Sequence, residues 1–212
     1  MTEAQPTSSD SWDVGSAVLV PPMDSLTVAQ KERRTRILKV AGELATEGGW
    51  DAVQMREVAQ GADVALGTLY RYFPSKEYLL VSMMINEVQG LADRLSVKPP
   101  QGDEPVDRVI DVLTRANFAL QRRPHATIAT IRALVSGNTE IAPVVNETFE
   151  LMRSIVSAAL DPAGASKGRD YTLSIELLTD IWLAALVAWI TQTADEGSLM
   201  PKLESAARVL FV

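Results

Sequence analysis

The sequence predicts an all-α protein with a three-helix N-terminal domain and a larger helical body. Two observations support this fold class. Apolar residues recur three and four positions apart along most of the chain, which is the spacing of one helix face, and no alternating stretch predicts a strand. Glycine and proline divide the helical segments, at positions 48–49, 74, 124, 137, 162–164 and 197.

Composition restricts the possible functions. The 212 residues include no cysteine and a single histidine, His125, which follows a proline and is expected at a helix start. We therefore expect no catalytic residue, no metal and no cofactor. No basic-then-apolar signal peptide begins the chain, and the longest apolar run, 177–190, contains Asp180 and is shorter than a bilayer span. These features predict a cytoplasmic protein that is not an enzyme and does not enter a membrane.

The first 26 residues are rich in Ser, Thr, Asp and Pro and predict a disordered arm, in which Met23 is an alternative translation start. A helix is expected over 27–48, capped by Thr27 and ended by two glycines. Its first half carries five basic residues against one acid, although the net charge of the whole chain is −7. These basic residues are Lys31, Arg33, Arg34, Arg36 and Lys39. Such a patch is typical of a nucleic-acid-binding surface, and a solvated helix face is the alternative.

The stretch 51–80 predicts two short helices joined by a tight turn. Met55, Val58 and Ala62 share one helix face, and Asp63 suits the left-handed backbone of a corner. A second helix is expected over 65–71, with Leu69 and Phe73 on its buried face. The side chains expected to point outward are those of Thr68, Tyr70 and Tyr72. We expect Pro74 to end this helix and Ser75 to cap the next one.

This pattern is typical of a helix-turn-helix, whose second helix enters the major groove of DNA. An ordinary helical hairpin of a core is the alternative. We assign 27–74 as the DNA-binding domain, with Gly67, Thr68 and Tyr70 near the bases on a helix that also includes Ala65 and Leu69. Further candidates are expected mostly to hold phosphates, and these are Arg33, Arg34, Gln54, Arg56, Tyr72 and Lys76.

The run Thr68-Leu-Tyr-Arg-Tyr-Phe-Pro-Ser-Lys76 resembles the signature of the TetR family of bacterial repressors. Two positions depart from that pattern: the family usually has Gly at Asp63 and Ser or Thr at Ala65. Because Ala65 cannot cap a helix, we expect Asp63 to do so. Within the family the chain looks most like the actinobacterial repressors of cholesterol catabolism, on segments 53–56, 62–65, 67–76, 121–124, 180–183 and 188–190.

Residues 75–212 predict a larger ligand-binding and dimerisation domain. A long helix over 75–96 begins it, and further helices are expected over 105–122, 125–136, 139–160, 170–194 and 199–211. The helix over 170–194 is apolar on two sides, which requires two partners. One partner is its own body, and the other is a second subunit, so helices 170–194 and 199–211 are expected to form a homodimer. A central helix of a monomeric bundle is the alternative.

Large apolar side chains in this body predict a pocket for a hydrophobic small molecule. They are Met83, Met84, Phe118, Leu134, Phe149, Met152, Trp182 and Trp189. The resemblance implies an effector that is a steroid intermediate carried as a coenzyme A thioester. Arg122, Arg123 and Arg132 are the candidate cations at the mouth of such a pocket. Plain core packing is the alternative for the apolar residues, and surface charge for the arginines.

Together these features predict a homodimeric, ligand-responsive transcriptional repressor of steroid, cholesterol or other lipid catabolism genes. Its partners are a double-stranded, palindromic DNA operator and a lipid-derived effector that releases it. Three alternatives remain open. The same fold responds to a fatty acyl thioester or a drug; the cavity belongs to an enzyme; or the helices form a protein-interaction module.

Overall fold

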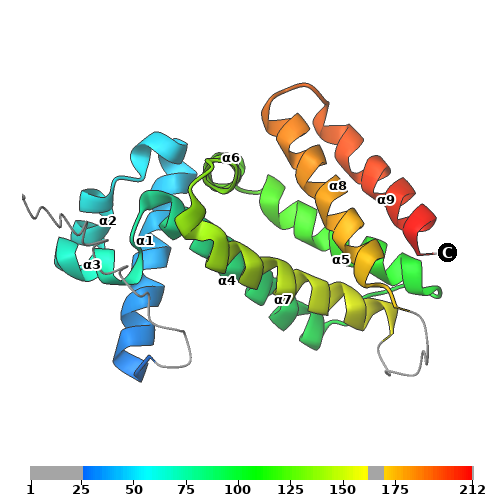
Figure 1. The fold of residues 1–212 in the computed structure, drawn as a ribbon, viewed down its shortest axis with the longest axis horizontal. Helices are drawn as coiled ribbons and strands as arrows, with labels where there is room; N and C mark the ends of the chain where they lie inside the picture. The colour runs from blue at the N-terminus through cyan, green and yellow to red at the C-terminus, as the bar shows by residue number, and fades with distance from the viewer. Residues whose placement is uncertain (1–25, 162–169, 212) are drawn as a thin grey trace, which may run out of the picture.

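A computed structural model describes residues 26–161 and 170–211, and this part of the chain is helical and contains no strand (Figure 1). The helices are α1 (Val28–Ala52), α2 (Met55–Gly61), α3 (Leu66–Tyr72), α4 (Lys76–Val97), α5 (Pro105–Gln121), α6 (Pro124–Leu134), α7 (Ala142–Leu160), α8 (Thr172–Ile190) and α9 (Leu199–Leu210). Short 3₁₀ turns over Thr139–Ile141 and Glu196–Ser198 precede α7 and α9. The all-α prediction is confirmed. The arm predicted over 1–26 lies outside the described residues, apart from the buried Leu26.

Local signals explain where the N-terminal helices begin and break. Thr27 caps α1 through a reciprocal capping box with Gln30. The two glycines interrupt the helix as expected, with Gly49 at a φ of +63°, before a last turn that contains Trp50. Asp63 has a φ of +51° in the turn between α2 and α3, so the predicted left-handed corner is also confirmed.

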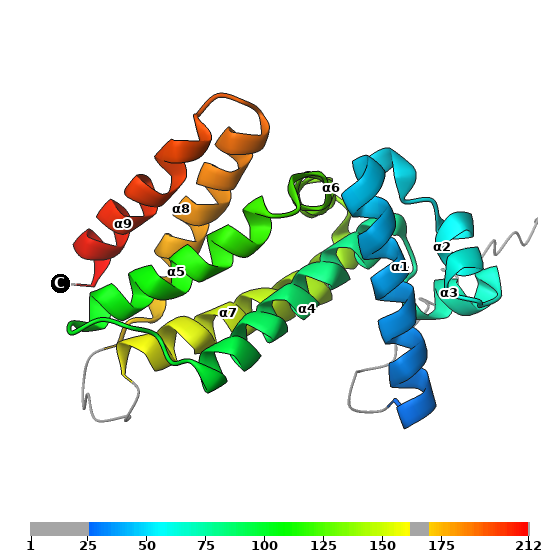
Figure 2. The ribbon, with the colours of Figure 1, turned by 180° about the vertical axis from the view of Figure 1, so that it is seen from behind.

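The body is a bundle in which α4 and α7 run side by side and α8 and α9 form a pair against α5 (Figures 1 and 2). The short α6 lies between α1 and the rest of the body and packs on α1, α4 and α8. It is the main contact from the body to α1, because α1 packs on α6 more extensively than any other described pair of helices.

Helix α4 belongs to two hydrophobic cores. Its first turns bury Leu79 and Leu80 in a core with α1, α2, α3 and α6. Its later turns bury Val88 and Leu91 in a second core with α5, α7, α8 and α9. Ser75 caps the helix by accepting a hydrogen bond from the Tyr78 backbone N–H. The 22 residues of α4 therefore connect the three-helix N-terminal domain directly to the interior of the body.

Helix α8 keeps one apolar side outside the protomer. Ile175, Leu178 and Trp182 are buried, whereas Leu173 and Leu177 are 66% and 42% exposed. By length and composition α8 is the one candidate membrane span among the described residues, although core helices of soluble proteins pass the same test. The apolar run noted over 177–190 is the later part of this longer helix, Thr172–Ile190.

Candidate functional site

The outer side of α3 combines small and aromatic residues. Gly67 is exposed, and a Cβ atom built there meets nothing within 4 Å. Tyr70 is 43% exposed, Thr68 is half-buried, and Ala65 is exposed at the start of the helix. Because helix residues three positions apart share a face, Gly67 and Tyr70 present one continuous surface to a partner. This surface has the low relief that a helix needs to enter a groove.

Two residues of α3 lie in the core, Leu69 as its predicted place on the buried face requires and Tyr72 against the prediction that it points outward. Leu69 has no exposed area, and Tyr72 is 3% exposed. The expectation that Tyr72 points outward to hold a phosphate was wrong because Tyr72 lies three positions after Leu69, on the same inner face. The Tyr72 hydroxyl is buried without a hydrogen-bond partner among the described residues.

Two predicted phosphate-binding cations have partners inside the protein. The Arg34 guanidinium lies 5.3 Å from the centroid of the Phe73 ring, and its burial lowers its pKa. The Lys76 ammonium lies 4.3 Å from the centroid of the Trp50 ring and donates a hydrogen bond to the Trp50 carbonyl. Partial burial lowers the pKa of Lys76 as well. Contact of Arg34 and Lys76 with the DNA backbone stays a prediction.

The remaining candidates stay accessible. Gln54 and Arg56 are exposed at the start of α2, and Arg33 is half-buried on α1. Arg71 is also exposed, in the last turn of α3, and was not among the DNA-contacting candidates predicted from the sequence. It lies four positions after Gly67, so helical spacing from Gly67 and Tyr70 would have found it.

The start of α3 differs from the expectation. Ala65 is its N-cap residue and makes no side-chain hydrogen bond. Asp63, two residues earlier, does not act as the cap either, so the expected capping by Asp63 was wrong. Its role in the described structure is the left-handed turn residue, which places α3 at an angle to α2.

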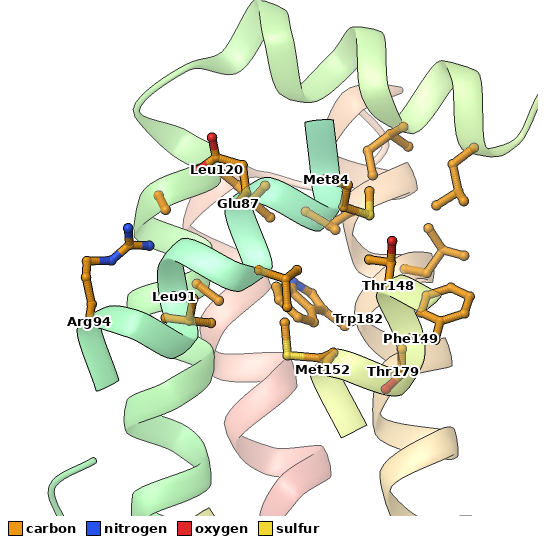
Figure 3. A pocket seen from close by; sticks show the side chains of 17 residues that line it. Met84, Glu87, Leu91, Arg94, Leu120, Thr148, Phe149, Met152, Thr179 and Trp182 are labelled. Carbon is orange, nitrogen blue, oxygen red and sulfur yellow. The ribbon is translucent and has the colours of Figure 1, made fainter. Parts of the chain in front are cut away.

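The second candidate site is an apolar pocket enclosed by α4, α5, α6, α7 and α8 (Figure 3). Its lining is almost entirely carbon, with Leu91 of α4, Met152 of α7 and Trp182 of α8 near its centre. The cavity volume is about 80 Å³, room for a few water molecules. Sites that bury a drug-sized ligand are larger, roughly 300–1,000 Å³. A ligand of that size therefore requires the surrounding helices to move apart.

Five of the predicted ligand-binding residues line this cavity: Met84, Leu134, Phe149, Met152 and Trp182. None of the other lining residues was predicted; these are Glu87, Val88, Leu91, Arg94, Ala116, Ala119, Leu120, Ile131, Thr148, Thr179, Leu183 and Leu186. Val88 and Leu91 belong to an apolar stripe of α4 visible in the sequence, but the sequence does not show which part of such a stripe faces empty space.

Three predicted apolar lining residues lie elsewhere. Phe118 is 62% exposed, because the pocket side of α5 is formed by Ala116 and Ala119. Met83 is buried in the first core, next to a groove between α1 and α4. Trp189 packs against the second core, two helical turns beyond Trp182 and outside the cavity lining.

The predicted cations also lie outside the pocket. Arg122 is exposed on α5, with its guanidinium 5.9 Å from the Phe118 ring centroid. Arg132 is exposed on α6, over the Trp50 ring at 4.6 Å. The assignment of both to the pocket mouth was therefore wrong. Arg123 forms an ion pair with Glu87, which lines the pocket.

The Glu87–Arg123 ion pair lies where the cavity approaches the surface. A small hollow of about 40 Å³ shares Met84 and Leu120 with the cavity and borders the ion pair. A larger polar groove of about 510 Å³ between α1 and α4 shares Glu87 and Arg123 with that hollow and includes Lys39. These spaces are neighbours that share lining residues, and they lie between the apolar cavity and the surface of α1.

Family models match both parts of the chain. The model described as bacterial regulatory proteins, tetR family, matches residues 37–83. The model described as tetracyclin repressor-like, C-terminal domain, matches residues 102–210. The two models together account for most of the described structure. Among the described residues, no group of three or more His, Cys, Asp or Glu is placed to hold a metal ion.

Individual proteins resemble the chain over most of its length. The HTH-type transcriptional repressor KstR of Rhodococcus jostii is 39% identical over 183 residues, 86% of this chain and 84% of the relative. A TetR transcriptional regulator from Rhodococcus sp. RHA1 has a solved structure with a TM-score of 0.78, 32% identity, and coverage of 87% and 98%. Thermus thermophilus FadR, solved in complex with lauroyl-CoA, superposes with a TM-score of 0.66 at 22% identity and coverage of 84% and 92%.

Proposed function

Because this chain belongs to the TetR family of bacterial regulatory proteins, we propose that it is a repressor of lipid catabolism genes that an effector releases from DNA. The supporting observation is the arrangement of α4, which carries Ser75 and Lys76 at the end of the helix-turn-helix and Leu91 in the pocket wall. A change in the pocket is therefore transmitted along a single helix to the DNA-binding end.

The DNA-binding surface consists of the outer side of α3 with exposed residues of α1 and α2. Gly67, Thr68 and Tyr70 approach base edges, and Arg33, Arg56 and Arg71 hold phosphates. The basic start of α1 makes this end of an acidic protein attractive to DNA. A palindromic operator is expected, since a symmetric dimer reads two equivalent half-sites.

The dimer forms through α8 and α9. Leu173 and Leu177 are large apolar residues left exposed on α8, and Val209 is 78% exposed on α9. The two helices pack against each other on the outer side of the bundle (Figure 1). A second copy that covers this side would form a four-helix interface. This arrangement also accounts for the hydropathy of α8 without a membrane and is consistent with a cytoplasmic protein.

The effector is an apolar, lipid-derived molecule, and a coenzyme A thioester of a steroid acid is our first candidate. The apolar lining suits its body, and the neighbouring space beside Glu87 and Arg123 suits a polar tail. The resemblance to the actinobacterial repressors of cholesterol catabolism supports the steroid, and a FadR protein solved with lauroyl-CoA makes a fatty acyl thioester the second candidate. Because the cavity is small, the effector stabilises a conformation with the helices farther apart, and DNA is released if that conformation does not fit the operator.

A gel-shift titration tests this function. The full chain is titrated onto the promoter upstream of its own gene and onto neighbouring promoters, with and without a steroid coenzyme A thioester or lauroyl-coenzyme A. A shifted band that one thioester abolishes supports the proposal and identifies the effector class. A band that both thioesters leave unchanged rejects the lipid effector, and absence of any sequence-specific band rejects the repressor.

A further inference from the structure

Among the described residues that line the pocket, Trp182 has the one buried side-chain nitrogen or oxygen without a hydrogen-bond partner. Its indole extends from α8 into the space between α4 and Met152 of α7, with the nitrogen on the side turned toward α4 (Figure 3). Trp182 is 8% exposed, and its Nε1 atom is buried without a hydrogen-bond partner. Buried polar groups normally have partners, so this N–H requires an explanation.

The threonine and glutamate side chains of the lining are already engaged, and the Arg94 guanidinium is exposed to solvent at the edge of α4. The Thr148 hydroxyl donates to the Val144 carbonyl at 2.7 Å, and the Thr179 hydroxyl donates to the Ile175 carbonyl at 2.8 Å. Glu87 is paired with Arg123 at the edge of the pocket. Around Trp182, hydrophobic side chains such as those of Leu91 and Leu186 offer no acceptor. The N–H is therefore available to a molecule that enters the pocket.

We propose that Trp182 is the specificity-determining residue of the effector pocket and donates its indole N–H to a carbonyl oxygen on an apolar effector. This inference rests on the proposed function of the pocket as a lipid site. An indole N–H is a donor only, so its complement is an acceptor. The apolar surroundings require that acceptor to be neutral and carried on a hydrocarbon body, as in a ring ketone or an acyl thioester.

The indole N–H is already desolvated in the free protein. A carbonyl that reaches it therefore restores a hydrogen bond without a further desolvation penalty for the protein. A ligand with the carbonyl should bind about tenfold tighter than the same ligand without it, since one net hydrogen bond contributes on the order of that factor. A hydrocarbon of equal size fills the cavity but leaves the donor unsatisfied.

Two pairs of probes test the proposal and separate the two sources of the carbonyl. The ketone pair is androst-4-en-3-one and androst-4-ene. The thioester pair is lauroyl-coenzyme A and its thioether analogue S-dodecyl-coenzyme A. Dissociation constants are measured by calorimetry for the full-length wild type, for Trp182→Phe, and for Trp189→Phe as a matched control outside the cavity lining.

The expected result is a preference of about tenfold for the carbonyl member of at least one pair in the wild type and in Trp189→Phe. Trp182→Phe should bind the carbonyl-free member about as well as the wild type does and should lose the preference. The pair that shows the preference identifies the carbonyl as ketone or thioester. A preference that persists in Trp182→Phe, or a wild type that binds both members of each pair equally, overturns the proposal.

Spectroscopy gives a second readout that does not depend on the variant at position 182. With ¹⁵N-labelled tryptophan, the four indole N–H signals are assigned by Trp→Phe variants at the other three positions. The Trp182 signal should move downfield with the carbonyl probe and not with its partner. An unmoved signal at saturation overturns the assignment. Failure of all four probes to bind the wild type rejects the lipid effector itself, and the role of Trp182 with it.

Discussion

The Arg132 guanidinium lies 4.6 Å from the centroid of the Trp50 ring, so a helix of the pocket wall contacts the segment that leads into the helix-turn-helix. Ile131 and Leu134, on either side of Arg132 in α6, line the cavity. Lys76, at the start of α4, lies over the same indole at 4.3 Å. In the proposed mechanism, an effector that displaced α6 would act on the helix-turn-helix through these contacts with Trp50.

Replacement of Arg132 by Met should weaken the contact between α6 and Trp50. A cation–π contact at an exposed site contributes about 0.5–1 kcal/mol, so the melting temperature should fall by roughly 1–4 °C. The effector concentration that releases DNA should also rise. Calorimetry and gel shifts measure the two effects. Arg122→Met is the control, because Arg122 lies over the exposed Phe118 and contacts no DNA-binding helix. Equal behaviour of the two variants would contradict a coupling role for Arg132.

Tyr70→Ala should weaken operator binding by about tenfold or more, because the exposed ring is expected to contact the groove. Fluorescence anisotropy at low salt with a labelled operator measures the affinity. Phe118→Ala removes an aromatic side chain of similar exposure on α5 and should leave the affinity unchanged. Tight binding by Tyr70→Ala would show that α3 docks in another orientation.

Leu177→Glu should convert the dimer to a monomer, since it places a charge on the exposed apolar side of α8. Light scattering after size-exclusion chromatography gives the molar mass, and operator affinity should fall with it. Val97→Glu is the control, because Val97 is 87% exposed at the end of α4, away from α8. A dimeric Leu177→Glu protein would place the interface elsewhere.

Ala119→Phe should block the pocket while operator binding remains. Ala119 lines the cavity, and added bulk in a packed region costs about 1–3 kcal/mol of folding free energy. The variant should shift the operator band but ignore the effector that releases the wild type. Ala158→Phe adds the same bulk at an exposed position of α7 and should keep the response. Release of Ala119→Phe at the wild-type effector concentration would reject this pocket as the effector site.

Tyr78 predicts a loss of stability in alkali. Burial raises the pKa of its hydroxyl above the reference value of 10.0, so the folded state retains a proton that the unfolded state releases. The stabilisation of the folded state by the protonated Tyr78 hydroxyl is complete below pH 10. It is lost as the pH rises through the folded-state pKa. Urea denaturation at several alkaline pH values should show a smaller decline for Tyr78→Phe than for the wild type. Tyr70→Phe, at an exposed site, should decline as the wild type does.

Local signals made the helices and the turn predictable. Thr27 and Ser75 cap helices through their own side chains, and Asp63 adopts the backbone that its residue type tolerates. A closer count of helical spacing would also have placed Tyr72 inside and Arg71 outside. Such features depend on neighbours within about four residues, which a sequence displays directly.

The pocket lining was less predictable because it depends on how distant helices pack. Size and apolarity favoured Phe118 and Trp189, yet the pocket wall of α5 is formed by small alanines. Arginines near Pro124 suggested a pocket mouth, but Arg132 has an aromatic partner 82 positions earlier in the sequence, at Trp50. Neither the empty space nor such a partner leaves a trace in the local spacing of residues.

The small volume of the cavity implies that the proposed effector must exceed a minimum size. A short lipid that occupied only the roughly 80 Å³ available would bury little apolar surface, about 25 cal/mol for each Å² removed from water, and would not offset the parting of five helices. A long or multi-ring lipid gains enough contact to hold the helices apart. The regulator would then not respond to the small fragments left at the end of lipid breakdown and would respond to substrates and intermediates that keep a long chain or several rings.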